Sequence, residues 1–112
     1  MRRRMHRRDN THKAIKEGLI AAGFSVADTS QLGSSFPDLV AGKYGMDIKI
    51  ECKTPRDMKT ELGRRKTAQD AFSDGQASFA STWKGTPVIA AYCLEDALHG
   101  FAMLQKKNGY VR

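Results

Sequence analysis

Hydrophobic positions along the 112-residue chain recur first at helical spacing and then at strand spacing. Between Asn10 and Gly23 the apolar positions fall three or four residues apart, which predicts an amphipathic helix. Its apolar stripe consists of Ile15, Leu19 and Ala22. Asn10 or Thr11 is expected to cap the start of this helix, and Gly23 is expected to end it.

Three strand-like segments follow the first helix. Residues 24–28 (FSVAD) predict a short strand, and the polar residues 29–35, which contain Gly and Ser, predict a loop. Residues 37–42 (PDLVAG) and 47–53 (DIKIECK) predict two further strands joined by the tight segment KYGM. The pattern therefore favours a hairpin in the middle of the chain.

A second helix is predicted over residues 73–83 (SDGQASFASTW). Ser73 and Gln76 have the spacing of a capping box, in which each side chain binds the backbone N–H of the other residue. Phe79 and Trp83 form an apolar pair one turn apart.

One strand and one helix complete the predicted elements. Residues 87–94 (PVIAAYCL) form a nearly continuous apolar run, as expected of a strand buried on both faces. Residues 95–104 (EDALHGFAML) predict the last helix. The order is α-β-β-β-α-β-α, so we expect an α/β fold with a mixed sheet of about four strands flanked by helices.

The size of the chain suits one domain. We expect a basic, flexible arm over residues 1–9 and a single folded domain over residues 10–112. No segment approaches the roughly 18 consecutive apolar residues of a membrane span, and no apolar region follows the basic N-terminal residues as in a secretory signal. These features predict a cytoplasmic protein with no membrane partner.

The two cysteines, Cys52 and Cys93, lie in apolar strand-like runs. The sequence has no CxxC pair and no His at zinc-ligand spacing. We therefore expect both thiols to be reduced and buried.

The formal net charge of +7 is concentrated near the N-terminus. Residues 1–16 hold seven of the nineteen Lys and Arg residues and a single acid. A basic cluster of this kind releases counterions from a polyanion, so nucleic acid is the favoured partner, and a solubilising tail is the alternative. A second, weaker basic stretch lies in residues 54–66 (TPRDMKTELGRRK), and residues 60–72 predict a loop or irregular helix rich in basic residues. The expected contacts to nucleic acid are Arg2, Arg3, Arg4, Arg7, Arg8, His12, Arg64, Arg65 and Lys66.

Charged residues occupy the predicted hairpin in an unusual arrangement. Strand pleating places Glu51 and Lys53 on one face and the apolar residues of DIKIECK on the other. A hairpin folded between Tyr44 and Gly45 places Asp38 opposite Glu51, where like charges destabilise a sheet. Two carboxylates in this position need a cation.

The ion that this chemistry favours is Mg²⁺, a hard cation that takes oxygen ligands in an octahedron. Asp38, Glu51 and the backbone carbonyl of Cys52 could supply three of the roughly six ligands. A bound divalent ion lowers the pKa of its water and screens charge on a scissile phosphate, while Lys53 can orient the water or stabilise the phosphate oxygens. The predicted chemistry is phosphodiester hydrolysis, with Mg²⁺ or Mn²⁺ as the single cofactor.

The stretch GSSFPDLVAGKYGMDIKIECKT resembles the core of the PD-(D/E)xK nuclease superfamily. Within it, the chain is similar to the VRR-Nuc family of small phage and prophage nucleases and to archaeal Holliday junction resolvases, from about Thr11 to about Leu98. The resemblance implies a restriction-endonuclease-like fold and metal-dependent cleavage of DNA, often branched, by a homodimer. A phage or prophage origin would place the protein in the cytoplasm of a bacterial host.

The same resemblance assigns roles to individual residues. Asp38 matches the metal-binding aspartate, Glu51 the second metal ligand and Lys53 the catalytic lysine. Gln76 matches a glutamine that VRR-Nuc proteins carry at the start of the following helix, which makes it a fourth candidate catalytic residue. A capping box with Ser73 would explain Gln76 equally well.

The sequence departs from the resolvases in the first helix. Resolvases place a metal-site glutamate about three turns before the Gly-Phe that ends the helix, and His12 stands there in this chain. Glu17 is expected to face solvent beside Lys13. The sequence leaves open whether His12 or Glu17 completes the site, and whether one or two metal ions bind.

Two functions account for these features. The leading expectation is a metal-dependent DNA endonuclease, and the alternative is a non-catalytic nucleic-acid-binding module that retains the nuclease fold. Whether the substrate is branched DNA, linear DNA or RNA stays open. Residues that could form a dimer surface, or equally the core, are Tyr92, Phe101, Met103 and Tyr110.

Overall fold

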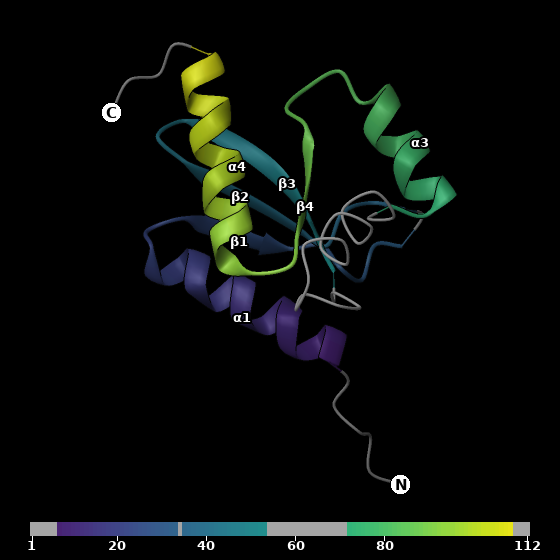
Figure 1. The fold of residues 1–112 in the computed structure, drawn as a ribbon, viewed down its shortest axis with the longest axis horizontal. Coiled ribbons are helices and arrows are strands. Elements are labelled where there is room, and N and C mark those ends of the chain that lie inside the picture. The colour runs from purple at the N-terminus through teal and green to yellow at the C-terminus, as the bar shows by residue number, and fades with distance from the viewer. Residues whose placement is uncertain (1–6, 34, 54–71, 109–112) are drawn as a thin grey trace, which may run out of the picture.

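The computed structural model describes residues 7–33, 35–53 and 72–108, with side chains from residue 10 onwards. Its elements are α1 (Arg7–Ala21), β1 (Ser25–Asp28), β2 (Leu39–Lys43), β3 (Met46–Cys52), α3 (Asp74–Thr82), β4 (Val88–Ala91) and α4 (Leu94–Lys107), as Figure 1 shows. This order confirms the predicted sequence of helices and strands. The second basic stretch, residues 54–66, and residues 60–71 of the predicted loop or irregular helix lie outside the described ranges.

The four described strands form one mixed sheet in the order β1-β2-β3-β4. β2 pairs antiparallel with β1 and with β3, whereas β4 pairs with β3 in parallel. The α/β class and the mixed four-stranded sheet predicted from the sequence are therefore confirmed, and they agree with a restriction-endonuclease-like fold.

The β2–β3 hairpin has the predicted register. Leu39 pairs with Ile50 at one end of the ladder and Lys43 with Met46 at the other. The two turn residues, Tyr44 (φ 59°) and Gly45 (φ 76°), both adopt the left-handed conformation, as a two-residue type I′ turn requires. Because this turn fixes the register, it also fixes which charged residues can face each other.

The hydrophobic core lies between one face of the sheet and helices α1 and α4. Ile15 and Leu19 of α1 are fully buried there, which confirms the predicted stripe. Phe101 of α4 packs edge-to-face on Phe24, with ring centres 4.8 Å apart. From the strands the core takes Leu39, Ala41, Met46, Ile48, Ile50, Cys52 and Ala91.

The first helix begins earlier than predicted. It starts at Arg7, so Asn10 and Thr11 lie inside the helix and do not cap it. Arginine is a good helix former, and Arg7 and Arg8 of the predicted arm belong to this helix. Gly23 has a φ of 96°, which suits the left-handed residue that ends a helix and confirms the predicted stop.

Two predictions around β4 are wrong. Only Val88–Ala91 form the strand, and Val88, Ile89 and Ala90 are half-buried, because β4 is an edge strand in the described part of the sheet. Cys93 is exposed, since the chain has already left the sheet and Cys93 is the residue that precedes α4. Phe101 is a core residue, which is the second of the two possibilities that the sequence left open for it.

Helix α3 contacts β3 on the face opposite the core through the side chain of Gln76 at its start and of Trp83 just after its end. None of its residues is buried, and aromatic contacts connect it to neighbouring segments. The ring centres of Phe36 and Phe79 are 5.3 Å apart, and those of Phe79 and Trp83 are 5.2 Å apart in a stacked pair. The capping box of Ser73 and Gln76 is present as predicted. Within the described ranges, no helix is both long and apolar enough to span a membrane.

Candidate active site

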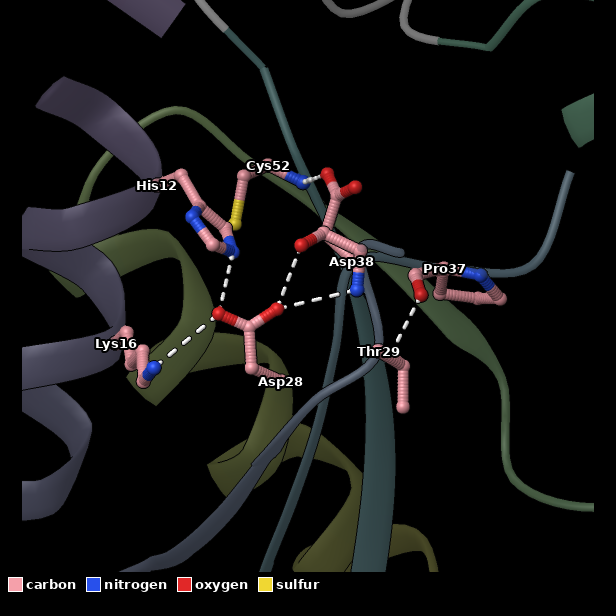
Figure 2. A network of polar contacts seen from close by, with 8 residues as sticks. His12, Lys16, Asp28, Thr29, Pro37, Asp38 and Cys52 are labelled. Atoms are coloured by element: carbon pink, nitrogen blue, oxygen red, sulfur yellow. Dashed lines mark hydrogen bonds and ion pairs between the residues drawn. The ribbon is translucent and has the colours of Figure 1, made fainter. Parts of the chain in front are cut away.

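Asp38 lies immediately before β2 and is held in place from two sides. Its Oδ2 atom accepts a hydrogen bond of 2.9 Å from the backbone N–H of Cys52, as Figure 2 shows. The backbone of Thr29 donates to the Asp38 carbonyl at 2.8 Å, and the Thr29 hydroxyl donates to the Pro37 carbonyl at 2.7 Å. The side chain of Asp38 is thereby directed at the end of β3, and the residue is only 7% exposed.

Glu51 and Lys53 lie at the end of β3, where both side chains contact Gln76 of α3. Glu51 is 2% exposed, although a carboxylate is rarely buried unless it is paired. The Lys53 ammonium lies 4.0 Å from Glu51 Oε2, at the limit of an ion pair. The paired ladder ends at Leu39 and Ile50, and Asp38 and Glu51 are the next residues on the two segments.

Gln76 connects Glu51 with Lys53. Its Nε2 atom donates to Glu51 Oε2, and its Oε1 atom accepts from Lys53 Nζ, both at 2.7 Å. The same Oε1 atom accepts from the backbone N–H of Ser73 at 3.0 Å. Gln76 therefore serves both as the return half of the capping box and as a contact within the site, so the two interpretations from the sequence are compatible.

A second polar network lies behind the Asp38 loop, where α1 meets the end of β1 (Figure 2). His12 and Lys16 both point at Asp28, with His12 Nε2 at 3.5 Å and Lys16 Nζ at 3.2 Å from Asp28 Oδ2. The other carboxylate oxygen of Asp28 accepts hydrogen bonds from the backbone N–H and the hydroxyl of Ser30, at 3.1 and 2.6 Å. These contacts fix the turn from Asp28 to Ser30 and thereby position Thr29.

The environment of Asp28 lowers the pKa of its carboxyl. Burial raises the pKa of this carboxyl, but the hydrogen bonds from Ser30 and Lys16 and the nearby His12 outweigh burial and lower the pKa from 3.8 to about 2. Asp28 thus stays ionised over the whole physiological range. It is a lasting negative partner for His12 and Lys16.

The residues predicted for the site fall into three groups. Asp38, Glu51, Lys53 and Gln76 surround the end of β3, and the backbone of Cys52 joins them through its N–H, while its side chain is fully buried in the core. His12 is in the second turn of α1, directed at Asp28, and Glu17 is exposed. The other residues predicted to contact nucleic acid lie outside the part of the chain that the structure describes. They are the side chains of Arg7 and Arg8 and the residues Arg2, Arg3, Arg4, Arg64, Arg65 and Lys66.

Sequence reasoning missed the supporting residues Asp28 and Thr29. The segment Asp28-Thr29-Ser30 has the composition of an Asx turn, in which an aspartate side chain binds a backbone N–H two residues later. That local signal was available. The sequence did not show that this turn lies beside Asp38, because that contact depends on the pairing of β1 with β2.

The donor set at the end of β3 fits a divalent cation. In the described ranges, no three His, Cys, Asp or Glu side chains are grouped to hold a metal ion. Two buried carboxylates on adjacent strands are present, however, and Lys53 offsets only one of their charges. Carboxylate oxygens are the ligands that Mg²⁺ prefers, and one or two of them suffice when water and phosphate complete the shell.

A mixed four-stranded sheet flanked by helices is the arrangement of the PD-(D/E)xK nucleases, and the order of Asp38, Glu51 and Lys53 on its hairpin follows the pattern that names them. The family model of the archaeal Holliday junction resolvases (Hjc) matches residues 5–111. The chain therefore belongs to this family of PD-(D/E)xK-type nucleases. No curated protein matches the chain, and no solved structure matches it.

Proposed function

We propose that this protein is a divalent-metal-dependent endonuclease that cuts branched DNA. The observation that carries the proposal is the pair of buried carboxylates, Asp38 and Glu51, beside the ammonium of Lys53 at the end of one hairpin. A binding module has no need to bury two like charges on adjacent strands, where they destabilise the sheet. Membership of a family named for Holliday junction resolution supports the branched substrate.

Each residue of the site has a role in this proposal. Asp38 and Glu51 would hold the metal ion, with the backbone carbonyl of Cys52 as a further ligand. The ion, when bound, would supply an acidified water and charge stabilisation at the scissile phosphate. Lys53 lies beside Glu51 and can donate hydrogen bonds to phosphate oxygens. Gln76 orients Glu51 and Lys53 relative to each other.

Several finer features belong to the same proposal. A four-way junction presents two symmetric strands, so we expect a homodimer that supplies two sites. Nucleic acid would also contact the basic N-terminal residues and residues 64–66, and His12 would contact a phosphate at the edge of the site. Similarity to VRR-Nuc proteins at Gln76 suggests a phage or prophage origin, with the host cytoplasm as the place of action.

The deciding experiment is a cleavage assay on a labelled four-way junction, a flap, a linear duplex and a single strand. It compares the unaltered chain with Glu51→Gln and Lys53→Ala, with and without Mg²⁺ or Mn²⁺. We expect cutting of the junction only with the metal, and a loss of at least about 100-fold in each variant. Glu95→Gln is the matched control, because Glu95 is an exposed carboxylate on α4.

Two results would contradict the proposal. Cleavage that persists without metal, or in both site variants, would identify a contaminating nuclease. Junction binding without cutting under any metal would favour the non-catalytic binding module.

A further inference from the structure

A groove of about 1020 Å³ lies beside the edge strand β4, at the far end of α3 from Gln76. Its walls come from the end of α3 with the turn after it and from the second half of α4, and Ile89 of β4 contributes the floor. Figure 1 shows β4 passing between these two helices. The groove is separate from the candidate active site, because Val88 pairs with Lys49 whereas the site lies at the Cys52 end of β3.

Large apolar side chains are exposed in this groove. Trp83 is 46% exposed and Met103 is 53% exposed, one on each wall. Trp83 is held in place, since it stacks on Phe79 and the Lys49 ammonium lies 4.9 Å from its ring centre. A wall that is already rigid lowers the entropy cost of binding a partner.

All charged residues that line the groove are basic. The lining includes Lys84, Lys106 and Lys107 and no acidic residue. A second copy of the chain would bring the same three lysines against these, so self-association through the groove is disfavoured by like charge. An acidic partner is the complementary one.

The backbone of β4 offers a second kind of contact. In the described part of the sheet, Val88–Ala91 pair with β3 alone. An edge strand can accept an extended segment, and the backbone hydrogen bonds then supply affinity while alternate side chains supply specificity. Because α3 and α4 stand on opposite faces of the sheet, successive side chains of such a segment would face the two walls in turn.

We propose that this groove binds an extended acidic segment of a partner protein, which adds a strand to β4. Apolar side chains of the segment contact Trp83 and Met103, and its acidic side chains pair with Lys84, Lys106 and Lys107. The bound segment leaves the end of β3 open, so the partner can hold the protein while the candidate site is engaged.

The test uses the full chain, in which Trp83 is the only tryptophan and its fluorescence reports on the groove. The probe is a short synthetic peptide that alternates leucine or phenylalanine with glutamate. Two control peptides accompany it, one with lysine in place of glutamate and one methylated on alternate backbone nitrogens, which removes the pairing donors. We expect a saturable change in emission with the acidic peptide alone.

Variants of the groove sharpen the test. The double variant Lys106→Glu with Lys107→Glu should weaken peptide binding by about tenfold or more, and Met103→Gln, which adds no charge, should weaken it through the apolar wall. Lys13→Glu, which changes the charge of an exposed residue on α1, should bind like the unaltered chain. Circular dichroism checks that each variant is folded.

Four outcomes would overturn the inference. The first is no saturable change in emission with the acidic peptide, and the second is that the methylated peptide binds as tightly as the acidic one. The third is that junction DNA displaces the peptide, and the fourth is that the protein forms a dimer that the groove variants abolish. Displacement by DNA would assign the groove to the nucleic-acid surface. Loss of the dimer would assign it to a second copy.

Discussion

Gln76 makes hydrogen bonds to a helix cap and to two charged groups with one amide. Its oxygen accepts from Ser73 and Lys53, and its nitrogen donates to Glu51. A neutral amide can satisfy a carboxylate and an ammonium together because it carries a donor and an acceptor side by side. Glu51 can therefore stay buried although Lys53 is 4.0 Å away.

Replacement of Gln76 by Glu should make the fold depend on a cation. The variant keeps the acceptor for Ser73 and Lys53 but places a third carboxylate against Glu51, which we expect to cost about 1–3 kcal/mol of unfolding free energy. Thermal unfolding in EDTA and in Mg²⁺ measures how far the stability of the variant depends on the cation. Mg²⁺ should stabilise Gln76→Glu more than it stabilises the unaltered chain. In Gln76→Met, which adds no charge, the extra response should be absent, and equal responses in the two variants would refute the arrangement.

The acid sensitivity of the fold should depend on Asp28. Its pKa of about 2 in the folded chain lies below the ordinary 3.8, so its contribution to stability is complete above pH 3.8 and is lost as the pH falls towards 2. The side chain is 29% exposed, so we expect a contribution of only about 1–2 kcal/mol. Asp28→Asn should flatten the stability profile between these pH values. Urea unfolding from pH 7 to pH 2 tests this, and a profile parallel to that of the unaltered chain would contradict it.

At the scale of elements, the start of α3 is fitted closely against the loop that carries Asp38. A Cβ atom on Gly75 would overlap the hydroxyl oxygen of Ser35. Ser35 itself has a φ of 66°, which is unusual for a residue other than Gly. The contact couples the position of the Asp38 loop to the position of Gln76.

A double-mutant cycle measures this coupling. Gly75→Ala would favour an isolated helix by about 1 kcal/mol, but here we expect it to destabilise the protein and lower cleavage because Ser35 is displaced. Ser35→Gly removes the hydroxyl and suits the left-handed backbone, so the double variant should recover stability and activity. Chemical unfolding and cleavage rates of the four proteins give the result. Additive effects would show that the two segments are not coupled.

The elements that sequence reasoning predicted best are those defined by local signals. The KYGM turn and the alternation in DIKIECK determine the hairpin register, and Ser73 with Gln76 determines the start of α3. The elements predicted wrongly depend on distant neighbours. An apolar run such as PVIAAYCL is the same for a central and an edge strand, and only the pairing of β4 decides which it is. The network of His12 with Asp28 likewise required the packing of α1 on the sheet.

For the molecule as a whole, positive charge lies in separate regions for which we propose different partners. Arg2, Arg3 and Arg4 precede α1, which begins at Arg7, and the lysines of the groove lie beside β4. Deleting residues 2–6 leaves α1 intact. Comparing the deletion variant with the unaltered chain therefore separates the proposed long-range attraction to DNA from the proposed chemistry at the end of β3.

We expect this deletion to weaken junction binding and its dependence on salt. Three fewer phosphate contacts should reduce the slope of log affinity against log salt by up to about 2.7. Binding isotherms on a four-way junction at several salt concentrations measure the slope, and cleavage at saturating protein should be unchanged. Neutral substitution of Lys106, an exposed lysine of the groove on α4, is the control. An unchanged slope would mean that these arginines do not contact DNA.

The connection between β3 and β4 has a consequence for the folding pathway. β2 and β3 meet across a two-residue turn, whereas β4 joins β3 only after the chain has passed from Cys52 to Val88. Local pairs form at a smaller entropy cost than distant ones, so the hairpin should assemble first. Asp38 and Glu51 would then face each other before Gln76 arrives between Glu51 and Lys53. Refolding should therefore pass through a stage of charge repulsion, which mild acid or a divalent cation would accelerate.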